Sequence, residues 1–344
     1  MMNFDEFRMR LEEDINLAYP GIRTRQQEVE RMQAEPYQAL AIFPEEGQIG
    51  INLNLDNLYK HYSNGHSYSE ILESAKAQTQ DFFDTPPLFD VEFLMDYEDM
   101  KTMLTVDMVN TRRNAEMLKD VPHKEYEDLS MVYRIQVMGR EKGAGSILVT
   151  NQLLERYGID QEQLHNDALE NAHVIKPARM QTLFQALGSL GDEIDGMPSK
   201  AAPQMYVVST EDMVKGAAAI FYPGMMDACT RSIRQDYFII PSSVHEVLLV
   251  PDNTGVTAAE LQDMVRSVNS TEVAREEQLS DHVYHYDSKE HLFELGETYE
   301  ARKASIVAER PGPQSVLEEL KSRQKENDLK PKPPEKAHAQ EESL

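Results

Sequence analysis

The sequence lacks tryptophan and contains a single cysteine, Cys229, so no disulfide can form within the chain. This usage is typical of a reducing cytoplasm, and we expect Cys229 to be a small buried hydrophobic residue rather than a nucleophile. No apolar run approaches the ~20 residues that span a bilayer, and the N-terminus lacks the basic and apolar regions of a signal peptide. We therefore expect a cytoplasmic protein with no membrane partner.

The motifs that identify common enzyme classes are also missing. The sequence contains no Walker A or G-x-G-x-x-G phosphate-binding pattern, no C-x-x-C or H-E-x-x-H zinc pattern, and no G-x-S-x-G hydrolase pattern. The three glycines from Gly139 to Gly145 have no Lys-Ser/Thr after them, and a β-hairpin turn explains them better. We therefore expect no cofactor.

Positive charge is scarce, because 34 basic residues face 60 acidic ones for a formal net charge of −26. Residues 301–344 hold 9 Lys/Arg and 8 Asp/Glu, which leaves residues 1–300 with 25 and 52 and a net charge of −27. Such a surface repels the phosphates of nucleic acids and favours a basic protein partner. We expect no direct binding of DNA or RNA.

Hydrophobic periodicity predicts an α+β fold that begins with a small subdomain over residues 1–85. Its signals are apolar residues at helical spacing, two apolar segments around a Pro-Glu-Glu-Gly turn, and a capping-box pair. They predict a helix over 3–18, strands over 37–43 and 48–55, and a helix from Ser67 to about residue 82. Two adjacent prolines at 86 and 87 mark the boundary to the next domain.

Residues 86–300 are expected to form a larger α+β domain around a mixed sheet. Its first half is predicted to contain strands over 102–109, 128–138 and 146–150, a helix over 112–119, helices capped by Asn151 and Asp160, and a helix opened by Pro177 over 177–187. Its second half follows a β-β-α-β-β-α order: strands 205–208 and 217–222, helix 223–233, strands 237–240 and 247–250, and a helix from Thr257 to 268, with an edge strand at 283–286.

Residues 301–344 have a different composition, rich in Lys, Glu and Pro and poor in large apolar residues. Such a segment cannot bury enough apolar area to order itself, so we expect a disordered tail. Ser315 and Glu318 have capping-box spacing, which predicts a short helix to residue 325 within it.

Four segments carry a resemblance to a known family. They are Asp236–Asp252 (DYFIIPSSVHEVLLVPD), Gly216–Gly224 (GAAAIFYPG), Val121–Lys124 (VPHK) and Leu279–Tyr286 (LSDHVYHY). In the chain order 121–124, 216–224, 236–252 and 279–286 they resemble the bacterial family known as domain of unknown function 5688, common in gut-dwelling Firmicutes and often found near mobile elements. The resemblance implies a cytoplasmic setting and a possible association with mobile elements, but assigns no catalytic residue.

The densest group of chemically reactive side chains lies between two predicted strands. Ser242, Ser243, His245 and Glu246 fall within five residues, and a nucleophile with a histidine base would need such residue types. Partners this close in sequence rarely meet in that geometry, however. The alternative is a turn in which Pro241 ends the strand and a serine bonds the backbone.

A second group surrounds the predicted edge strand. On a strand, His285 and Asp287 share one face, and His245 would join them if the strands were neighbours, giving ligands for a divalent metal. Polar decoration of an exposed edge strand is the alternative.

Two functions follow from these observations. The first is a non-catalytic protein-binding or regulatory factor, which the acidic surface and the missing motifs favour. The second is a hydrolase-like enzyme of unrecognised type that uses the segment Pro241–Glu246. A deep apolar-walled pocket around His245 would favour the enzyme.

Overall fold

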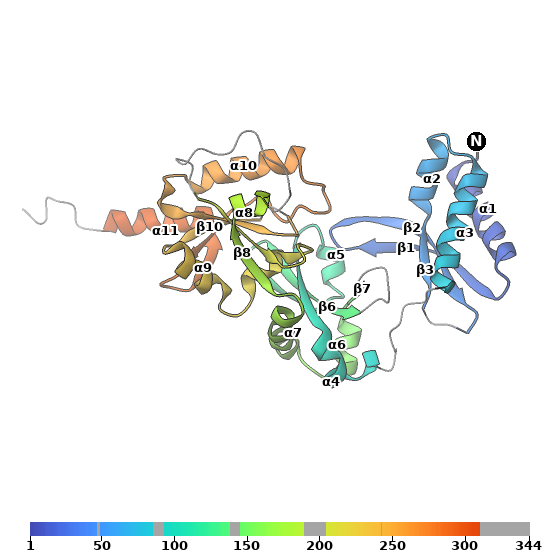
Figure 1. The fold of residues 1–344 in the computed structure, drawn as a ribbon, viewed down its shortest axis with the longest axis horizontal. Helices are drawn as coiled ribbons and strands as arrows, with labels where there is room; N and C mark the ends of the chain where they lie inside the picture. Colours follow the sequence, from blue (N-terminus) through green and yellow to red (C-terminus); the bar gives the residue numbers. More distant parts are fainter. Residues whose placement is uncertain (47–48, 85–92, 138–144, 189–203, 242, 310–344) are drawn as a thin grey trace, which may run out of the picture. The chain divides into compact units, whose positions relative to one another are not determined.

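The computed structural model describes residues 1–46, 49–84, 93–137, 145–188, 204–241 and 243–309. Helices and three antiparallel sheets make up the described chain, so the expected α+β class is confirmed (Figure 1). The chain divides into two compact units, Met1–Gly296 and Glu297–Leu344.

The N-terminal layer is a three-stranded sheet, in the order β1-β2-β3, with three helices on one face. Its elements are α1 (Phe4–Ala18), β1 (Ile22–Arg31), β2 (Ala34–Pro44), β3 (Ile51–Asn54), α2 (Leu55–Ser63) and α3 (Tyr68–Asp84). Buried side chains of the helices, among them Phe7, Leu11 and Ile71, pack on Leu40 and Leu53 of the sheet. The predicted first helix, the hairpin and the capping box ahead of α3 are confirmed, whereas the sequence indicated neither β1 nor α2.

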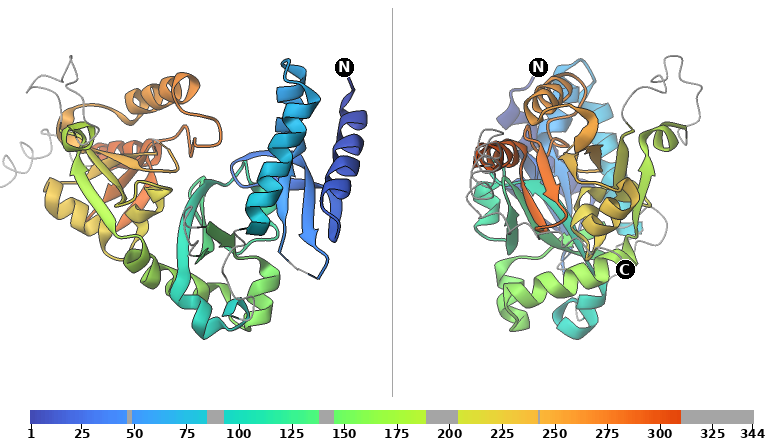
Figure 2. Two further views of the ribbon diagram at one scale, coloured as in Figure 1. Left: turned by 45° about the vertical axis from the view of Figure 1, so that its right-hand side comes forward. Right: turned by 90° about the vertical axis from the view of Figure 1, so that its left-hand side faces the viewer.

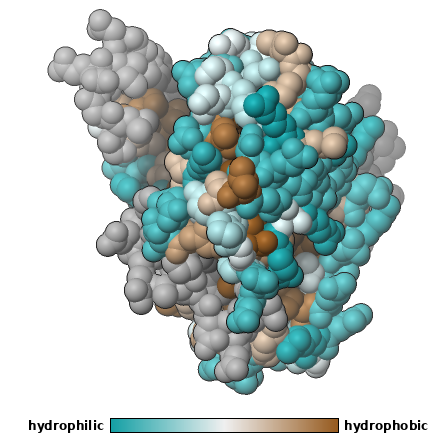
Figure 3. Space-filling model, turned by 90° about the vertical axis from the view of Figure 1, so that its right-hand side faces the viewer, coloured by the Kyte–Doolittle hydropathy of each residue, from teal (hydrophilic) through white to brown (hydrophobic). Residues whose placement is uncertain are grey.

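The outward face of this layer is mostly hydrophilic. Figure 3 shows hydrophobic side chains there only as a narrow strip. On α1 the exposed hydrophobic side chains include Met9 and Leu17. A patch this narrow is ordinary for the surface of a folded protein.

The middle of the chain forms a second sheet, in the order β4-β6-β5, with β7 paired to β6. Its elements are η1 (Phe93–Met95), α4 (Tyr97–Met100), η2 (Lys101–Met103), β4 (Leu104–Asn110), α5 (Ala115–Leu118), β5 (His123–Tyr126), β6 (Leu129–Val137), β7 (Gly145–Leu148), α6 (Asn151–Tyr157) and α7 (Gln161–Ile175). The predicted β6–β7 hairpin is confirmed, while its loop lies outside the described residues. Asp160 caps α7 as expected, but Thr150 caps α6 in place of Asn151.

The third sheet has six strands in the order β13-β12-β10-β11-β9-β8, and α10 runs along it (Figure 2). Its elements are β8 (Ala178–Thr182), α8 (Leu183–Gly188), β9 (Tyr206–Thr210), η3 (Gly216–Phe221), α9 (Met225–Ile233), β10 (Tyr237–Ile240), β11 (Val247–Pro251), η4 (Asp252–Thr254), α10 (Ala258–Thr271), β12 (Tyr284–Asp287) and β13 (Leu292–Leu295). Cys229 is fully buried on α9, as expected, and burial raises the pKa of its thiol to about 12.

Four expectations for this region are corrected. The helix over 177–187 is the strand β8 followed by α8, because residues 178–182 pair with β9. The strand over 217–222 is the 3-10 helix η3, whose small residues pack closely on β9. The strand near 283–286 is internal, since β12 lies between β10 and β13. The described strands also form separate antiparallel sheets rather than one mixed sheet.

The C-terminal unit contains α11 (Gly296–Glu309), so the first nine residues of the expected tail are helical. The rest of that segment, including the helix predicted over 315–325, lies outside the described residues. Among the helices that the structure describes, none is long and apolar enough to cross a membrane.

Candidate functional site

The tip of the β1–β2 hairpin packs against the region of the second sheet. β1 and β2 have 10 and 11 residues and β3 only 4, so the hairpin extends past its own sheet. At the tip, Met32 packs against the cluster of Val109, Leu118 and Val132. Gln33, next to it, has a left-handed backbone (φ 67°) and is buried, which turns its side chain inward.

Three buried amide side chains hold this tip in place. The Gln33 backbone N–H donates to Asn114 Oδ1 (2.7 Å), and Asn114 Nδ2 donates to Gln33 Oε1 (2.6 Å) and to the Asn110 carbonyl (2.7 Å). Gln33 Oε1 also accepts from the Asn110 N–H (2.9 Å). These bonds satisfy polar groups that would otherwise be costly to bury. We call Gln33, Asn110 and Asn114 the amide clasp.

The same clasp binds the irregular segment between α10 and β12. Gln33 Nε2 donates to the Gln278 carbonyl (2.8 Å) and Asn110 Nδ2 to the Leu279 carbonyl (2.8 Å). The Arg113 guanidinium donates to the carbonyls of Arg275 (2.9 Å) and Gln278 (3.0 Å). Three segments far apart in sequence therefore meet at one place.

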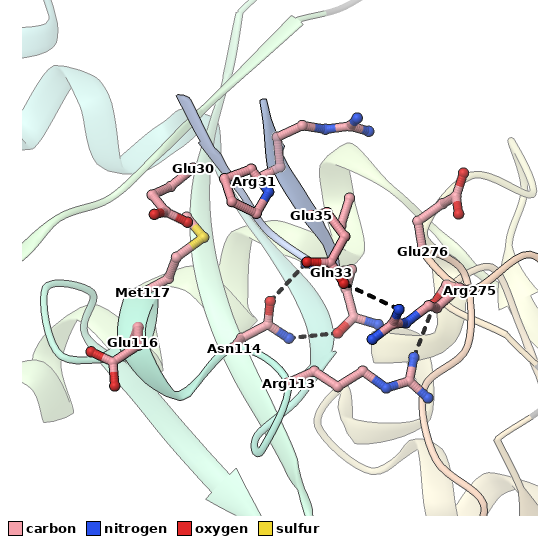
Figure 4. Close-up of a pocket in the computed structure, with 12 residues that line it drawn as sticks. Glu30, Arg31, Gln33, Glu35, Arg113, Asn114, Glu116, Met117, Arg275 and Glu276 are labelled. Carbon is pink, nitrogen blue, oxygen red and sulfur yellow. Dashed lines mark hydrogen bonds and ion pairs between the residues drawn. The ribbon is translucent and has the colours of Figure 1, made fainter. Parts of the chain in front are cut away.

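A cavity of about 480 Å³ opens above the clasp (Figure 4). It is lined by Glu30, Arg31, Gln33, Ala34, Glu35, Pro36, Arg113, Asn114, Glu116, Met117, Arg275 and Glu276. Four carboxylates and three guanidinium groups thus surround a floor of amides and short apolar side chains. The cavity is a candidate binding site, because it is concave and charged side chains converge on it from three segments of the chain.

The charges of the cavity are arranged unevenly. Arg275 pairs with Glu35 (3.2 Å), and the Arg31 guanidinium lies 5.9 Å from the centre of the Tyr37 ring. Figure 4 shows Glu30 and Glu116 on either side of Met117, at the wall opposite Arg275. That wall combines two carboxylates with an apolar side chain, and the exposed Glu116 also pairs with Lys119, which lies outside the lining of the cavity.

A polar cluster lies beside the clasp, where the segment after Leu279 continues. Asp128 accepts hydrogen bonds from the hydroxyls of Ser280 (2.7 Å) and Tyr284 (2.6 Å), and His282 Nδ1 lies 3.1 Å from the same carboxylate. Burial, reinforced by Asp128, raises the pKa of Tyr284 well above its ordinary value. Ser280 Oγ and Asp128 Oδ2 both lie against the same ring nitrogen of His282, Nδ1 (3.4 and 3.1 Å), so the ring does not link the serine to the carboxylate through its two nitrogens as a nucleophile relay requires.

The candidate residues between β10 and β11 form a turn. Ser243 Oγ donates to Glu246 Oε1 (2.9 Å) and accepts from the His245 N–H (3.0 Å). His245 Nδ1 accepts from the Lys215 N–H (3.2 Å), so neutral His245 carries its proton on Nε2, 3.4 Å from Glu277 Oε1. Ser243 therefore contacts the His245 backbone rather than its ring. Ser242 lies outside the described residues.

The three candidate metal ligands have separate partners. His285 is fully buried on β12, with Nε2 3.4 Å from Asp252 Oδ2, and Asp287 Oδ1 accepts from the backbone N–H of Lys289 (3.1 Å). His245 faces Glu277 instead. Within the described chain, no group of three or more His, Cys, Asp or Glu side chains could hold a metal ion.

Sequence reasoning did not find the residues of the amide clasp or of the cavity. Asn and Gln have no periodic signature, and their partners here are up to 245 residues away. The one local signal was Asn114, a residue that favours turns, close to the start of α5.

A family model described as a family of unknown function, DUF5688, matches residues 4–288 of the chain. Comparisons with curated proteins and with solved structures return no match. The family match covers the whole of the hairpin, the clasp and the cavity.

Proposed function

The chain belongs to the DUF5688 family, whose function is unknown, and we propose that it is a non-catalytic binding factor that takes a basic protein partner at the hairpin-tip cavity. One observation carries this proposal: the polar side chains at the floor of the cavity hydrogen-bond to one another and to the neighbouring backbone. Gln33 and Asn114 satisfy one another and the neighbouring backbone. They hold three chain segments in position rather than presenting a reactive group.

The types of side chain around the cavity also favour binding over catalysis. Its twelve lining residues include no Ser, Thr, Cys, His, Lys or Tyr. The lining therefore lacks the usual nucleophiles and histidine, the most common general base. The lining is rich in Arg and Glu. Such residues provide selective electrostatic contacts at the rim of an interface and govern the rate of association.

The acidic wall explains the preference for a basic partner. A lysine or arginine side chain can lay its aliphatic part on Met117 and bring its charge to Glu30 and Glu116, which flank it (Figure 4). The net charge of −26 attracts a basic protein from a distance.

The test is co-purification from native cells with the wild-type chain, the double variant Glu30→Lys/Glu116→Lys, and the control Glu13→Lys. Glu13 is exposed on α1 and is not among the residues that line the cavity. We expect a basic protein to be retained by the wild type and the control but lost from the double variant. Retention should weaken as salt rises, because exposed charges are screened.

Two results would contradict the proposal. One is equal retention of the same partner by the double variant, which would place its contact elsewhere on the protein. Alternatively, turnover of a small-molecule substrate that is lost in Glu30→Lys/Glu116→Lys would make the cavity an active site.

A further inference from the structure

β1 is a long edge strand. Nine of its ten residues pair with β2, with a register shift between Val29 and Arg31, and among the described residues no other strand pairs with it. An edge of this length presents a row of backbone N–H and C=O groups to a strand of another chain. Natural proteins usually shorten, bend or cover such edges.

The two faces of β1 carry different side chains with different partners. Thr24 and Gln26 point toward the helices, where Thr24 Oγ1 donates to Glu12 (2.8 Å) and Gln26 Nε2 donates to the same carboxylate (2.6 Å). Arg23 and Arg25 alternate with them, so they point to the opposite face, and both are exposed.

That second face carries two guanidinium groups, which attract negative charge. The Arg23 guanidinium lies 5.8 Å from the centre of the Phe43 ring on β2 and donates to the Pro44 carbonyl (3.5 Å). Arg25 lies opposite the fully buried Ala41, and its own side chain is exposed. Two arginines two residues apart on one strand face are exceptional in a chain where acidic residues outnumber basic ones 60 to 34.

We propose that an acidic segment of a partner protein adds to β1 as a fourth strand, with its carboxylates opposite Arg23 and Arg25. Opposite charges that face one another across neighbouring strands stabilise the pair, and like charges destabilise it. An extended segment places every second side chain on one face, about 6.6–6.8 Å apart, which matches the spacing of the two arginines. This surface is separate from the cavity and does not depend on the proposed function.

Charge favours a short acidic peptide over a nucleic acid at this edge. A nucleic acid carries a phosphate on every residue and would extend its charge beyond the two arginines, where acidic side chains of the body repel it. A peptide can carry carboxylates only where the arginines lie. Its remaining backbone groups bond to the edge of β1.

The test is fluorescence anisotropy with a labelled eight-residue peptide of Thr with Glu only at the fourth and sixth positions, so that its two carboxylates can face Arg23 and Arg25. We expect saturable binding at low salt, and a loss of about two- to five-fold in affinity for each of Arg23→Gln and Arg25→Gln. The control Arg179→Gln removes an exposed arginine from the edge strand β8 and should leave binding unchanged. Hydrogen exchange of the β1 amides should slow when the peptide is bound.

A second peptide separates strand addition from simple charge attraction. It has the same sequence with every second backbone amide methylated, so it keeps its charge but cannot pair as a strand. We expect it to bind at least ten-fold more weakly. The proposal is overturned if the methylated peptide binds equally well, if Arg179→Gln weakens binding as much as Arg25→Gln, or if single-stranded DNA binds as tightly as the acidic peptide.

Discussion

His165, buried on α7, is held by two side chains of the second sheet. Lys124 Nζ donates to His165 Nε2 (3.2 Å), so the proton of the ring is on Nδ1 and points to the Tyr133 hydroxyl (3.0 Å). Burial, and then the positive charge of Lys124, lower the pKa of His165 to about 4. The fold thus requires this histidine to be neutral.

A dependence of stability on pH follows from His165. The unfolded chain binds this proton near pH 6.5 and the folded chain only near pH 4, so acid favours unfolding within that window. We expect the free energy of unfolding to fall by roughly 3 kcal/mol through this group as pH drops from 7 to 4. The variant His165→Gln should show a flatter profile in urea unfolding measured across that range. Replacing the exposed His173 by Gln is the control, and an unchanged slope in His165→Gln would contradict the assignment.

Gly216 opens η3 where the backbone passes closest to β9. A Cβ there would lie 2.3 Å from Ser209 Oγ and 2.4 Å from the Thr210 nitrogen, and the latter belongs to the backbone and cannot turn away. We expect Gly216→Ala to lower the free energy of unfolding by about 1–3 kcal/mol, because the added methyl group overpacks this contact. Gly188→Ala, where an added Cβ would meet no atom within 4 Å outside its own helix and chain neighbours, should be nearly neutral. The two variants are compared by thermal unfolding, and equal melting temperatures would argue against the close approach.

At the scale of elements, the β1–β2 hairpin is the part whose placement depends most on tertiary contacts. Its far end is attached by the amide clasp rather than by its own sheet. Asn114→Ala removes the partner of the Gln33 N–H and two donated bonds in a buried place. We expect a loss of about 2–4 kcal/mol in the free energy of unfolding, because Gln33 is left with unsatisfied buried groups.

Hydrogen exchange can locate this effect. The Gln33 amide should exchange faster in Asn114→Ala, while amides of α1 keep their protection relative to the global stability. Asn16→Ala, which removes an exposed bond to Thr24, is the matched control. A uniform change across the chain would show that the clasp does not hold the hairpin specifically.

At the scale of the whole molecule, charge is the dominant property. The net charge of −26 repels phosphate groups within the Debye length, about 8 Å at physiological ionic strength and longer at low salt. We expect no shift of duplex or single-stranded DNA in gel-shift assays, even at low salt, where basic proteins bind best. Tight binding by the purified protein would contradict the electrostatic argument and require a basic surface that the charge balance does not indicate.

The sequence determined the features that depend on neighbouring residues. The apolar spacing of α1, the caps Asp160 and Thr257, and the hairpin between β10 and β11 follow from contacts within a few residues, so periodicity and capping chemistry were enough to find them. The α+β class follows from the same patterns.

Tertiary structure decided the features whose partners lie far away in sequence. β1 has almost no apolar alternation and is a strand only because β2 pairs with it. Residues 178–182 are a strand for the same reason, against the helix that Pro177 suggested. The amide clasp joins Gln33 to residues 77 to 245 positions away. A hydrogen bond between distant residues leaves no periodic trace in the sequence, so the cavity could be found only once the chain was folded.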